Sequence, residues 1–429
     1  MASFYIPLSG LDADSTALNT IANDLSNMNT TAFKAQTTNF SDLFYQQIGS
    51  TGSGDPIQVG AGVKVASNET SFTQGSLNTT GNATDVALNG NGFFVVNNGG
   101  GSNEFSRAGG FSLTQAGNLV TSNGLSVMGY PAVNGVVNTN APLTAINIPV
   151  GQVQQPQATT TLNMTTNLDS ASTTGTAFPA MITVYDSLGV PHIATVTYTQ
   201  TATNTWSYSV ALPASDFTAG VSTPVTGTMS FDANGNLTTV TQTTPVAVAA
   251  TPVGNGAGDI AGIPLTFNGL ADKATNLNMS WNLLGASGTP TISQVDTASA
   301  VSETTQNGYA PGQYQSFTVG SDGAVTASYS NGQQQTVGQL ALANVANVQG
   351  LQLLGDGDYA TTLASGTASI ATSGAAGLGT LTDGALEESN VNISAEFSDL
   401  IIAQRAFEAN SKAVTTFDTI TQETINMIH

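Results

Sequence analysis

Apolar residues follow a heptad pattern at the N-terminal end of the chain. They recur every seven residues from Phe4 to Leu25, and further apolar residues follow three positions after the last two of these. The positions are Phe4, Leu11, Leu18, Ile21, Leu25 and Met28. This spacing is typical of one face of a helix that pairs with another helix. It predicts a helix over about 4–28, and Ser9 is suited to cap its start.

The C-terminal end carries a second heptad pattern. Its apolar positions, with Phe417 and Ile425 widening the face, are Ile393, Leu400, Phe407, Val414, Phe417, Ile425 and Ile428. Thr421 is the one polar member of the seven-residue series. The pattern predicts a helix within 388–429, and either Ser389 or Asn392 is suited to cap its start.

Two such helices at opposite ends of one chain can pair with each other or with copies in other subunits. An ordinary amphipathic helix on a globular core would explain either one alone. The N-terminal segment carries Asp12, Asp14 and Asp24 and no base, so apolar burial, worth about 25 cal/mol per Å², must drive the pairing. Because an isolated pair of helices is marginal in water, we expect both ends to be disordered in the free monomer and to fold on association.

The middle of the chain has the pattern of short strands and turns. The apolar run at 93–96 predicts a buried strand, and the Asp-Gly and Asn-Gly pairs at 322–323 and 331–332 are hairpin turns around another. Residues 72–150 and 303–370 share this texture and predict one β domain. Residues 151–302, richer in threonine, alanine and serine, predict a second β domain inserted into the first.

The remaining segments, 29–71 and 371–387, predict an extended linker region. Gly49, Gly52 and Gly54 lie in a glycine- and serine-rich stretch that favours flexibility. The predicted fold class is mainly β with long α-helical termini. It is a nested multidomain arrangement in which the terminal helices form an α-helical coiled-coil domain and two β domains lie outside it.

Composition excludes several classes of protein. Only 8% of the residues are charged, and 27 acids against 6 bases give a net charge of −21. So acidic a chain repels phosphate backbones, which argues against a nucleic-acid partner. No stretch approaches 18 apolar residues, so we expect no membrane insertion. The N-terminus lacks a basic region followed by an apolar one, so we expect no cleaved signal peptide.

No constellation of catalytic or ligand-binding residues emerges from the sequence. The chain has no cysteine and two histidines, His192 and His429, in neither triad nor metal spacing. The acidic loops at 232–236 and 356–358 are interpreted as turns rather than calcium sites. We therefore expect no catalytic residue, no metal and no cofactor. A pair of carboxylates for glycoside hydrolysis needs no local motif and stays open at this point.

The two termini resemble the signature segments of bacterial flagellar rod and hook proteins. At the N-terminal end the likeness rests on Leu-Ser-Gly-Leu at 8–11, Asn-Asp-Leu-Ser-Asn-Met-Asn-Thr at 23–30 and Phe-Lys at 33–34. At the other end it rests on residues 384–391 and 404–412. The middle resembles the hook members of this family in particular, at 167–169, 185–189, 307–312 and 329–333, while 106–109 and 117–120 resemble the β domain that the family shares.

This resemblance implies a structural subunit, not an enzyme, of a helical homopolymer. The terminal helices would line a narrow channel, the β domains would form outer layers, and the tube would act as a universal joint between motor and filament. The implied partners are further copies of the chain, the distal rod, the hook cap, the hook–filament junction proteins and the flagellar type III export apparatus. The implied location is the flagellum outside the cell.

Two departures and two alternatives accompany the resemblance. Ala32 stands where the family usually has glycine, and Asn392 stands where it often has an acid. A different axial protein, such as a distal rod subunit, would share the terminal signatures but lack the insertion at 151–302. A β-rich surface adhesin or carbohydrate-active protein would instead be a stable monomer with a ligand groove.

Overall fold

The computed structural model describes residues 4–50, 52–245, 247–254, 256 and 258–427. The chain divides into two compact units. The first, here called the terminal unit, comprises residues 1–150, 316–328 and 334–429. The second, called the inserted unit, comprises residues 151–315 and 329–333. Most regular structure is β, with one long helix near each terminus, so the predicted fold class, mainly β with long α-helical termini, is confirmed.

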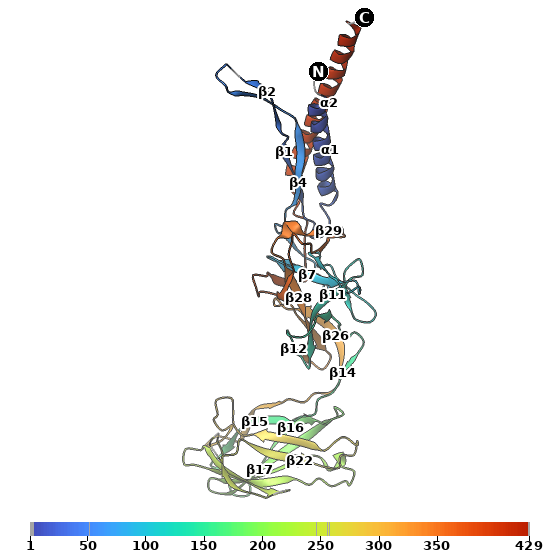
Figure 1. The fold of residues 1–429 in the computed structure, drawn as a ribbon. Helices are drawn as coiled ribbons and strands as arrows, with labels where there is room; N and C mark the ends of the chain where they lie inside the picture. The colour runs from blue at the N-terminus through green and yellow to red at the C-terminus, as the bar shows by residue number, and fades with distance from the viewer. Residues whose placement is uncertain (1–3, 51, 246, 255, 257, 428–429) are drawn as a thin grey trace. The chain divides into compact units, whose positions relative to one another are not determined.

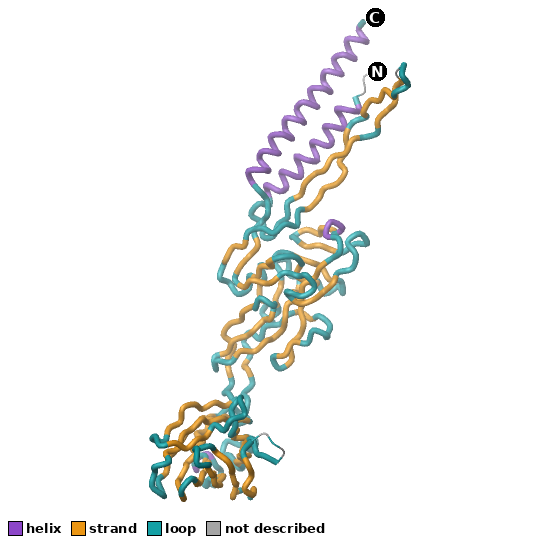
Figure 2. The backbone as a smooth tube through the Cα atoms, turned by 90° about the vertical axis from the view of Figure 1, so that its left-hand side faces the viewer, coloured by secondary structure: helices purple, strands orange, loops and turns teal. Residues whose placement is uncertain are grey.

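The two long helices of the terminal unit form an antiparallel pair. Helix α1 spans Tyr5–Ser26 and helix α2 spans Ile393–Asn426, and Figure 2 shows them side by side. The ring of Phe4 meets that of Phe417 near one end, with centroids 6.0 Å apart. Asn392 caps α2, because its side chain accepts from the backbone N–H groups of Ser394 and Ala395. Of the two caps that the sequence predicted, Ser389 and Asn392, the second is therefore confirmed.

The predicted cap of the first helix is wrong. Helix α1 begins at Tyr5, with Phe4 in the capping position, so Ser9 lies inside the helix. The Ser9 hydroxyl donates to the backbone oxygen of Ile6 at 2.7 Å and accepts from the backbone N–H of Val63 at 3.2 Å. The apolar residues from Phe4 onward extend the helix past the serine, and the serine binds the neighbouring strand instead.

Paired strands occupy the segment for which the sequence predicted an extended linker. Strands β1 (Gln36–Asp42) and β4 (Val63–Thr70) are antiparallel, as are β2 (Tyr45–Ser50) and β3 (Pro56–Gly60). Together they form a ribbon that runs beside the helices (Figure 2). Gly49 belongs to β2, while Gly52 and Gly54 lie in the turn before β3. The flexibility of this turn stays a prediction.

The β domain of the terminal unit is organised around β7 (Phe93–Asn97), β11 (Ser126–Val133) and β28 (Gln334–Asn344). Strand β7 pairs with both of the others, and its four residues from Phe93 to Val96 are buried, as the apolar run predicted. The short strands before β14 are β5 Leu77–Thr79, β6 Val86–Asn89, β8 Asn103–Ser106, β9 Ser112–Leu113, β10 Leu119–Val120, β12 Val136–Val137 and β13 Thr144–Ala145. The later elements are β27 Ala324–Tyr329, η2 Val348–Gly350, β29 Gln352–Gly355, β30 Asp358–Ala360, β31 Ser369–Thr372, β32 Thr380–Asp383 and β33 Ala385–Glu387.

The inserted unit is a sandwich of two sheets around one hydrophobic core. The first sheet is antiparallel, in the order β16-β17-β18-β19-β20-β21. The second has the order β22-β23-β15-β24, with β25 paired to β15. Trp206 from the first sheet and Trp281 from the second are fully buried in the same core. They are the two tryptophans of the whole chain.

The strands of the inserted unit have the following residue ranges. In the first sheet they are β16 Ala177–Tyr185, β17 Pro191–Ala202, β18 Thr205–Ala211, β19 Val225–Phe231, β20 Leu237–Thr244 and β21 Val248–Pro252. In the second they are β15 Thr161–Asp169, β22 Gly262–Phe267, β23 Leu277–Asn282, β24 Ile292–Val295 and β25 Ala300–Gln306. A short helix η1 spans Ala214–Asp216, and β14 (Val153–Gln154) pairs with the start of β26 (Gly312–Val319). Among the described residues, neither long helix is apolar enough over its length to cross a membrane.

Candidate assembly surface and the buried junction beneath it

The long helix α2 lies at the surface of the terminal unit along its whole length. None of its 34 residues is buried. Of the predicted stripe, Leu400, Val414 and Phe417 are half-buried, whereas Ile393, Phe407 and Ile425 are exposed. Ile428 lies outside the described residues. A helix with this many uncovered apolar side chains is typical of an interaction surface.

Helix α1 is better covered than α2. Leu11, Leu18, Ile21 and Leu25 are half-buried. Phe4, in the helix N-cap position, and Met28, beyond the helix end, are exposed. The pairing of α1 with α2 therefore shields part of the predicted N-terminal stripe and leaves its two ends open.

The contact between the helices is polar and tight near its middle. The side-chain amide of Asn410 donates to Asp14 Oδ2 at 2.9 Å. A Cβ atom at Gly10 would lie 2.6 Å from Asn410 Nδ2, so glycine is what lets this amide lie against α1. The heptad positions alone give no sign of this contact, because Gly10 and Asp14 fall between them.

A groove of about 340 Å³ separates α1 and α2 from strand β1. Its lining combines apolar side chains with acidic ones, including Ile21, Phe40, Ile402, Asp14, Glu396 and Asp399. The pKa of Glu396 is raised by burial and then by the neighbouring charges of Asp24 and Asp399. The groove is therefore both apolar and crowded with like charges.

Further exposed apolar side chains were not singled out by the sequence pattern. On α2 and at the start of α1 they are Tyr5, Ile6, Leu8, Ile401, Ile402 and Ile420. On the ribbon of strands they are Phe40, Phe44, Tyr45, Ile48, Ile57 and Val59. Phe44 is 92% exposed. Strict heptad spacing misses these residues because they lie on other faces of the helices or on the ribbon.

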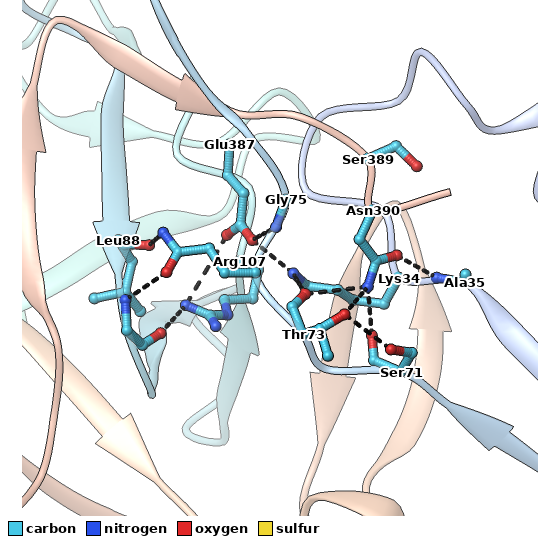
Figure 3. A network of polar contacts seen from close by, with 12 residues as sticks. Lys34, Ala35, Ser71, Thr73, Gly75, Leu88, Arg107, Glu387, Ser389 and Asn390 are labelled. Carbon is cyan, nitrogen blue, oxygen red and sulfur yellow. Dashed lines mark hydrogen bonds and ion pairs between the residues drawn. The ribbon is translucent and has the colours of Figure 1, made fainter. Parts of the chain in front are cut away.

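A buried ion pair joins the two ends of the chain beneath this surface. Lys34 Nζ lies 2.6 Å from Glu387 Oε1, and both side chains have no exposed area. Lys34 also donates to the backbone oxygen of Thr73 at 2.8 Å, and Glu387 Oε1 accepts from the backbone N–H of Gly75 at 2.9 Å. Figure 3 shows these groups converging from three segments of the chain. The pair thus holds together the N-terminal segment, the connection after β4 and strand β33.

Arg107 adds a second positive charge to the junction. Its Nη1 lies 4.0 Å from Glu387 Oε2 and donates to the backbone oxygen of Gly90 at 2.8 Å. The guanidinium also lies 5.7 Å from the centre of the Phe93 ring. Burial lowers the pKa of Lys34, and the contact with Glu387 opposes that effect. The single carboxylate of Glu387 therefore faces two buried cations, Lys34 in direct contact and Arg107 at the limit of ion-pair distance.

Asn390 ties the chain together just before α2 begins. Its amide nitrogen donates to the backbone oxygens of Ser71 and Thr73 at 2.8 and 3.0 Å, and its amide oxygen accepts from the backbone N–H of Ala35 at 2.8 Å. Ala32 adopts a positive φ of 56°, and its N–H donates to the backbone oxygen of Glu387 at 2.8 Å. The left-handed turn is thus kept here with alanine in the place of glycine.

Asp24 is a buried carboxylate at the end of α1. Its Oδ2 accepts from the backbone N–H of Gln36 at 2.7 Å, while Oδ1 has no hydrogen-bond partner among the described residues. Burial raises its pKa above the ordinary 3.8, and the Gln36 hydrogen bond opposes that rise. A raised pKa means that the folded state favours the protonated carboxyl. This stabilisation is complete below the unfolded pKa and is lost as the pH rises through the folded one.

The Asp24→Asn variant is therefore expected to be more stable than the parent chain at neutral pH, by about 1 kcal/mol. The amide carries no charge to desolvate and can still accept from Gln36. The gain should shrink as the pH falls through the raised pKa of Asp24 in the folded state, and it should be gone below 3.8, the unfolded value. Urea unfolding followed by circular dichroism at neutral and acid pH measures both the gain in stability and its decrease. Asp12→Asn, at an exposed position of α1, is the matched control. An equal gain in that control would assign the effect to net charge.

Family models match the chain in four places. The N-terminal segment 4–34 matches a flagella basal body rod protein model, and residues 87–167 match a flagellar hook protein FlgE/F/G D1 domain model. Residues 152–309 match a flagellar basal body protein FlaE D2 domain model. Residues 382–427 match a flagellar basal body rod FlgEFG protein C-terminal model. Lys34 falls in the first of these matches and Glu387 in the last.

Curated relatives match over the full length of the chain. The flagellar hook protein FlgE of Treponema pallidum is 35% identical over 100% of this chain and 99% of its own. FlgE of Salmonella typhimurium and FlgE of Escherichia coli are each 35% identical over 99% of this chain and 100% of their own. These matches favour neither a rod protein nor an adhesin or carbohydrate-active protein.

A solved structure agrees in fold. The flagellar hook protein FlgE2 of Helicobacter pylori aligns with a TM-score of 0.52 and 14% sequence identity, over 71% of this chain and 98% of its own. Sequence and fold thus lead to one family. The chain belongs to the flagellar hook protein family and is a structural subunit of the hook.

Proposed function

We propose that the exposed apolar side chains of the terminal helices are the surface through which subunits polymerise into the hook. The observation that carries this proposal is the 34-residue helix α2, in which no residue is buried within one chain. Burying these side chains against neighbouring copies would gain about 25 cal/mol per Å² of apolar area. The sequence-predicted stripe residues and their exposed neighbours on α2 and the ribbon would share this role.

The proposed polymer is an open helical tube. A contact that does not close into a ring propagates along a helix of subunits. The terminal helices would line the channel, and the β units would form the outer layers that slide as the tube bends and transmits torque. Interfaces with few charges suit such sliding, since no fixed ion pairs have to break. With 8% charged residues the chain fits this requirement.

The partners of the two tube ends are proposed from the family. The first subunits would meet the distal rod, growth would take place beneath the hook cap, and the last subunits would meet the hook–filament junction proteins. Subunits would reach the growing end through the flagellar type III export apparatus, without a cleaved signal peptide. A chain without cysteine cannot be trapped by a disulfide during that passage.

Removing both terminal helices is expected to abolish polymerisation. The full chain and a variant restricted to residues 29–387 are concentrated under salting-out conditions and imaged by electron microscopy. We expect curved or straight tubes from the full chain and only dispersed particles from the variant. The fluorescence of Trp206 and Trp281, both in the inserted unit, checks that the variant is still folded there. Tubes formed by the variant would contradict the proposal.

A further inference from the structure

Four titratable side chains meet at one end of the inserted unit. Asp186 lies in the turn after β16, His192 near the start of β17, Asp216 at the end of η1 and Asp272 in the loop after β22. Asp186 has no exposed side-chain area and His192 has 5%. The carboxylates of Asp216 and Asp272 are 21% and 23% exposed. Three separate connections of the sandwich thus bring one imidazole and three carboxylates together.

The hydrogen bonds fix which nitrogen of His192 is protonated. Nδ1 lies 2.8 Å from Asp216 Oδ2, and because an ionised carboxylate can only accept, Nδ1 carries the proton. In the neutral ring Nε2 then has a free lone pair. Nε2 faces Asp186 Oδ2 at 3.5 Å and Asp272 Oδ2 at 3.7 Å. Asp216 therefore orients the ring in the way that carboxylates orient metal-binding histidines.

The two facing carboxylate oxygens are turned toward the Nε2 side of the His192 ring, and the 3.5 Å contact of Asp186 Oδ2 is at the long limit of a hydrogen bond. Asp186 uses Oδ1 to accept from the backbone N–H groups of Leu188 and Val190, each at 2.8 Å, and turns Oδ2 toward the ring. Asp272 Oδ2 is buried and has no hydrogen-bond partner among the described residues. Three atoms with lone pairs thus converge on one point.

We propose that the inserted unit binds one divalent transition-metal cation, of the Zn²⁺ type, through His192 Nε2, Asp186 Oδ2 and Asp272 Oδ2. The three ligand atoms all lie within 4.8 Å of one another. With metal–ligand bonds of about 2.1 Å, separations of 3.5 and 3.7 Å correspond to bond angles of roughly 110–125°. Such angles suit a tetrahedral site whose fourth ligand is water. An imidazole nitrogen with two carboxylates is a donor set that Zn²⁺ accepts.

The cluster is also rich in acidic side chains and poor in cationic partners. Three carboxylates surround one imidazole, and among the described residues no lysine or arginine forms an ion pair with them. The loop at 232–236 provides a contrast. There Asp232 accepts from the backbone N–H groups of Asn234 and Asn236 and from the Asn236 amide. Its oxygens are satisfied by the turn itself, as the sequence predicted for this loop.

A bound cation would fasten the two sheets of the inserted unit at this end. Asp186 and His192 belong to the first sheet and its turn, and Asp272 to the connection between β22 and β23 of the second. These connections already meet through the backbone N–H of Thr275, which donates to Ser187 Oγ at 3.0 Å. Because the ligands come together only in the folded unit, binding would stabilise that unit by mass action.

Cation titration of the full chain tests the proposal. The protein is freed of metal with a chelator and titrated with Zn²⁺ by calorimetry and with Co²⁺ by visible absorption. We expect one equivalent to bind and the melting temperature, followed by tryptophan fluorescence, to rise. Asp272→Asn, nearly identical in shape, should lose this binding, while Asp216→Asn should weaken it about 10–100-fold through the misoriented ring. Asp296→Asn, exposed in the same unit, is the matched control and should bind like the parent.

Two results would overturn the proposal. One is a parent chain that binds no more cation than Asp272→Asn. The other is a parent chain in which ¹⁵N spectra of the imidazole show both ring nitrogens of His192 protonated in the presence of Zn²⁺. The first result would mean that the cluster holds no cation, and the second that a proton on Nε2, rather than a cation, holds the carboxylates together. Tryptophan fluorescence in chelator shows whether each variant is folded, so a loss of binding is not confused with unfolding.

Discussion

The Lys34→Met variant is expected to lose about 3–5 kcal/mol of unfolding free energy in the terminal unit. The methionine fills most of the space of the lysine stem but leaves Glu387 with no cation within hydrogen-bond distance. That carboxylate has no exposed area, and Arg107 approaches it only to 4.0 Å. A buried charge without its partner cannot recover the solvation that it lost on folding.

Denaturant unfolding followed by hydrogen exchange of the backbone amides of β7 and β28 measures this loss in the terminal unit, and it does not depend on whether the terminal helices are folded in the free monomer. Lys64→Met is the control, since Lys64 is exposed on strand β4. Its stability should change by no more than about 0.5 kcal/mol. In the double variant Lys34→Met/Glu387→Gln, the total loss of unfolding free energy should be smaller than the sum of the two single losses. Both substitutions remove the same interaction. Equal small losses for Lys34→Met and Lys64→Met would show that the pair does not support the junction.

The Ile425→Asp variant is expected to raise the concentration needed for polymerisation by roughly 10–100-fold. This corresponds to the 1.5–3 kcal/mol gained when one isoleucine side chain is buried. Ile425 is 54% exposed in the single chain, so its replacement should leave the monomer intact. The carboxylate would have to be desolvated without a partner in the assembled tube. Sedimentation across a series of protein concentrations gives the critical concentration.

Thr424→Asp is the matched control for this prediction. Thr424 is also exposed and lies next to Ile425 in the last turn of α2. Both variants place the same negative charge near the same helix end, so the unfavourable interaction with the helix dipole is shared. The difference between them therefore isolates the burial of the isoleucine side chain. If the two variants raised the critical concentration equally, charge repulsion between subunits would be the cause. The proposal that Ile425 is buried between subunits would then be wrong.

Periodic and local features of the fold were predictable from the sequence. The heptad spacing places both helices close to their observed bounds, because helix formation depends on residues three and four apart. Asn392 caps α2 by a contact with residues two and three positions later, which a local pattern contains. Ser9 was assigned as a cap on the same reasoning. It failed because the residues before it also form helix and its hydroxyl finds another partner.

Contacts between distant segments were not predictable in the same way. Lys34 and Glu387 are 353 positions apart, and nothing around either residue indicates the other. The cluster at His192 likewise draws its four side chains from three connections whose spacing matches no metal motif. The segment 29–71 is interpreted as a linker because its apolar pattern breaks down and residues 49–54 are rich in glycine and serine, whereas the strand pairing there is a contact between distant residues. Such features follow from the tertiary fold and leave little trace in one sequence.

The pairing of β14 with β26 gives the chain a modular architecture. Val153 pairs with Gln313 and Gln154 with Gly312, so the segment between them departs and returns on adjacent strands, which lie about 4.8 Å apart. Whatever domain fills this interval, the backbone re-enters the rest of the subunit at the same place. Evolution can therefore lengthen, shorten or exchange the inserted unit without altering the terminal helices. For the same reason this position is a natural site for grafting a foreign domain onto the subunit.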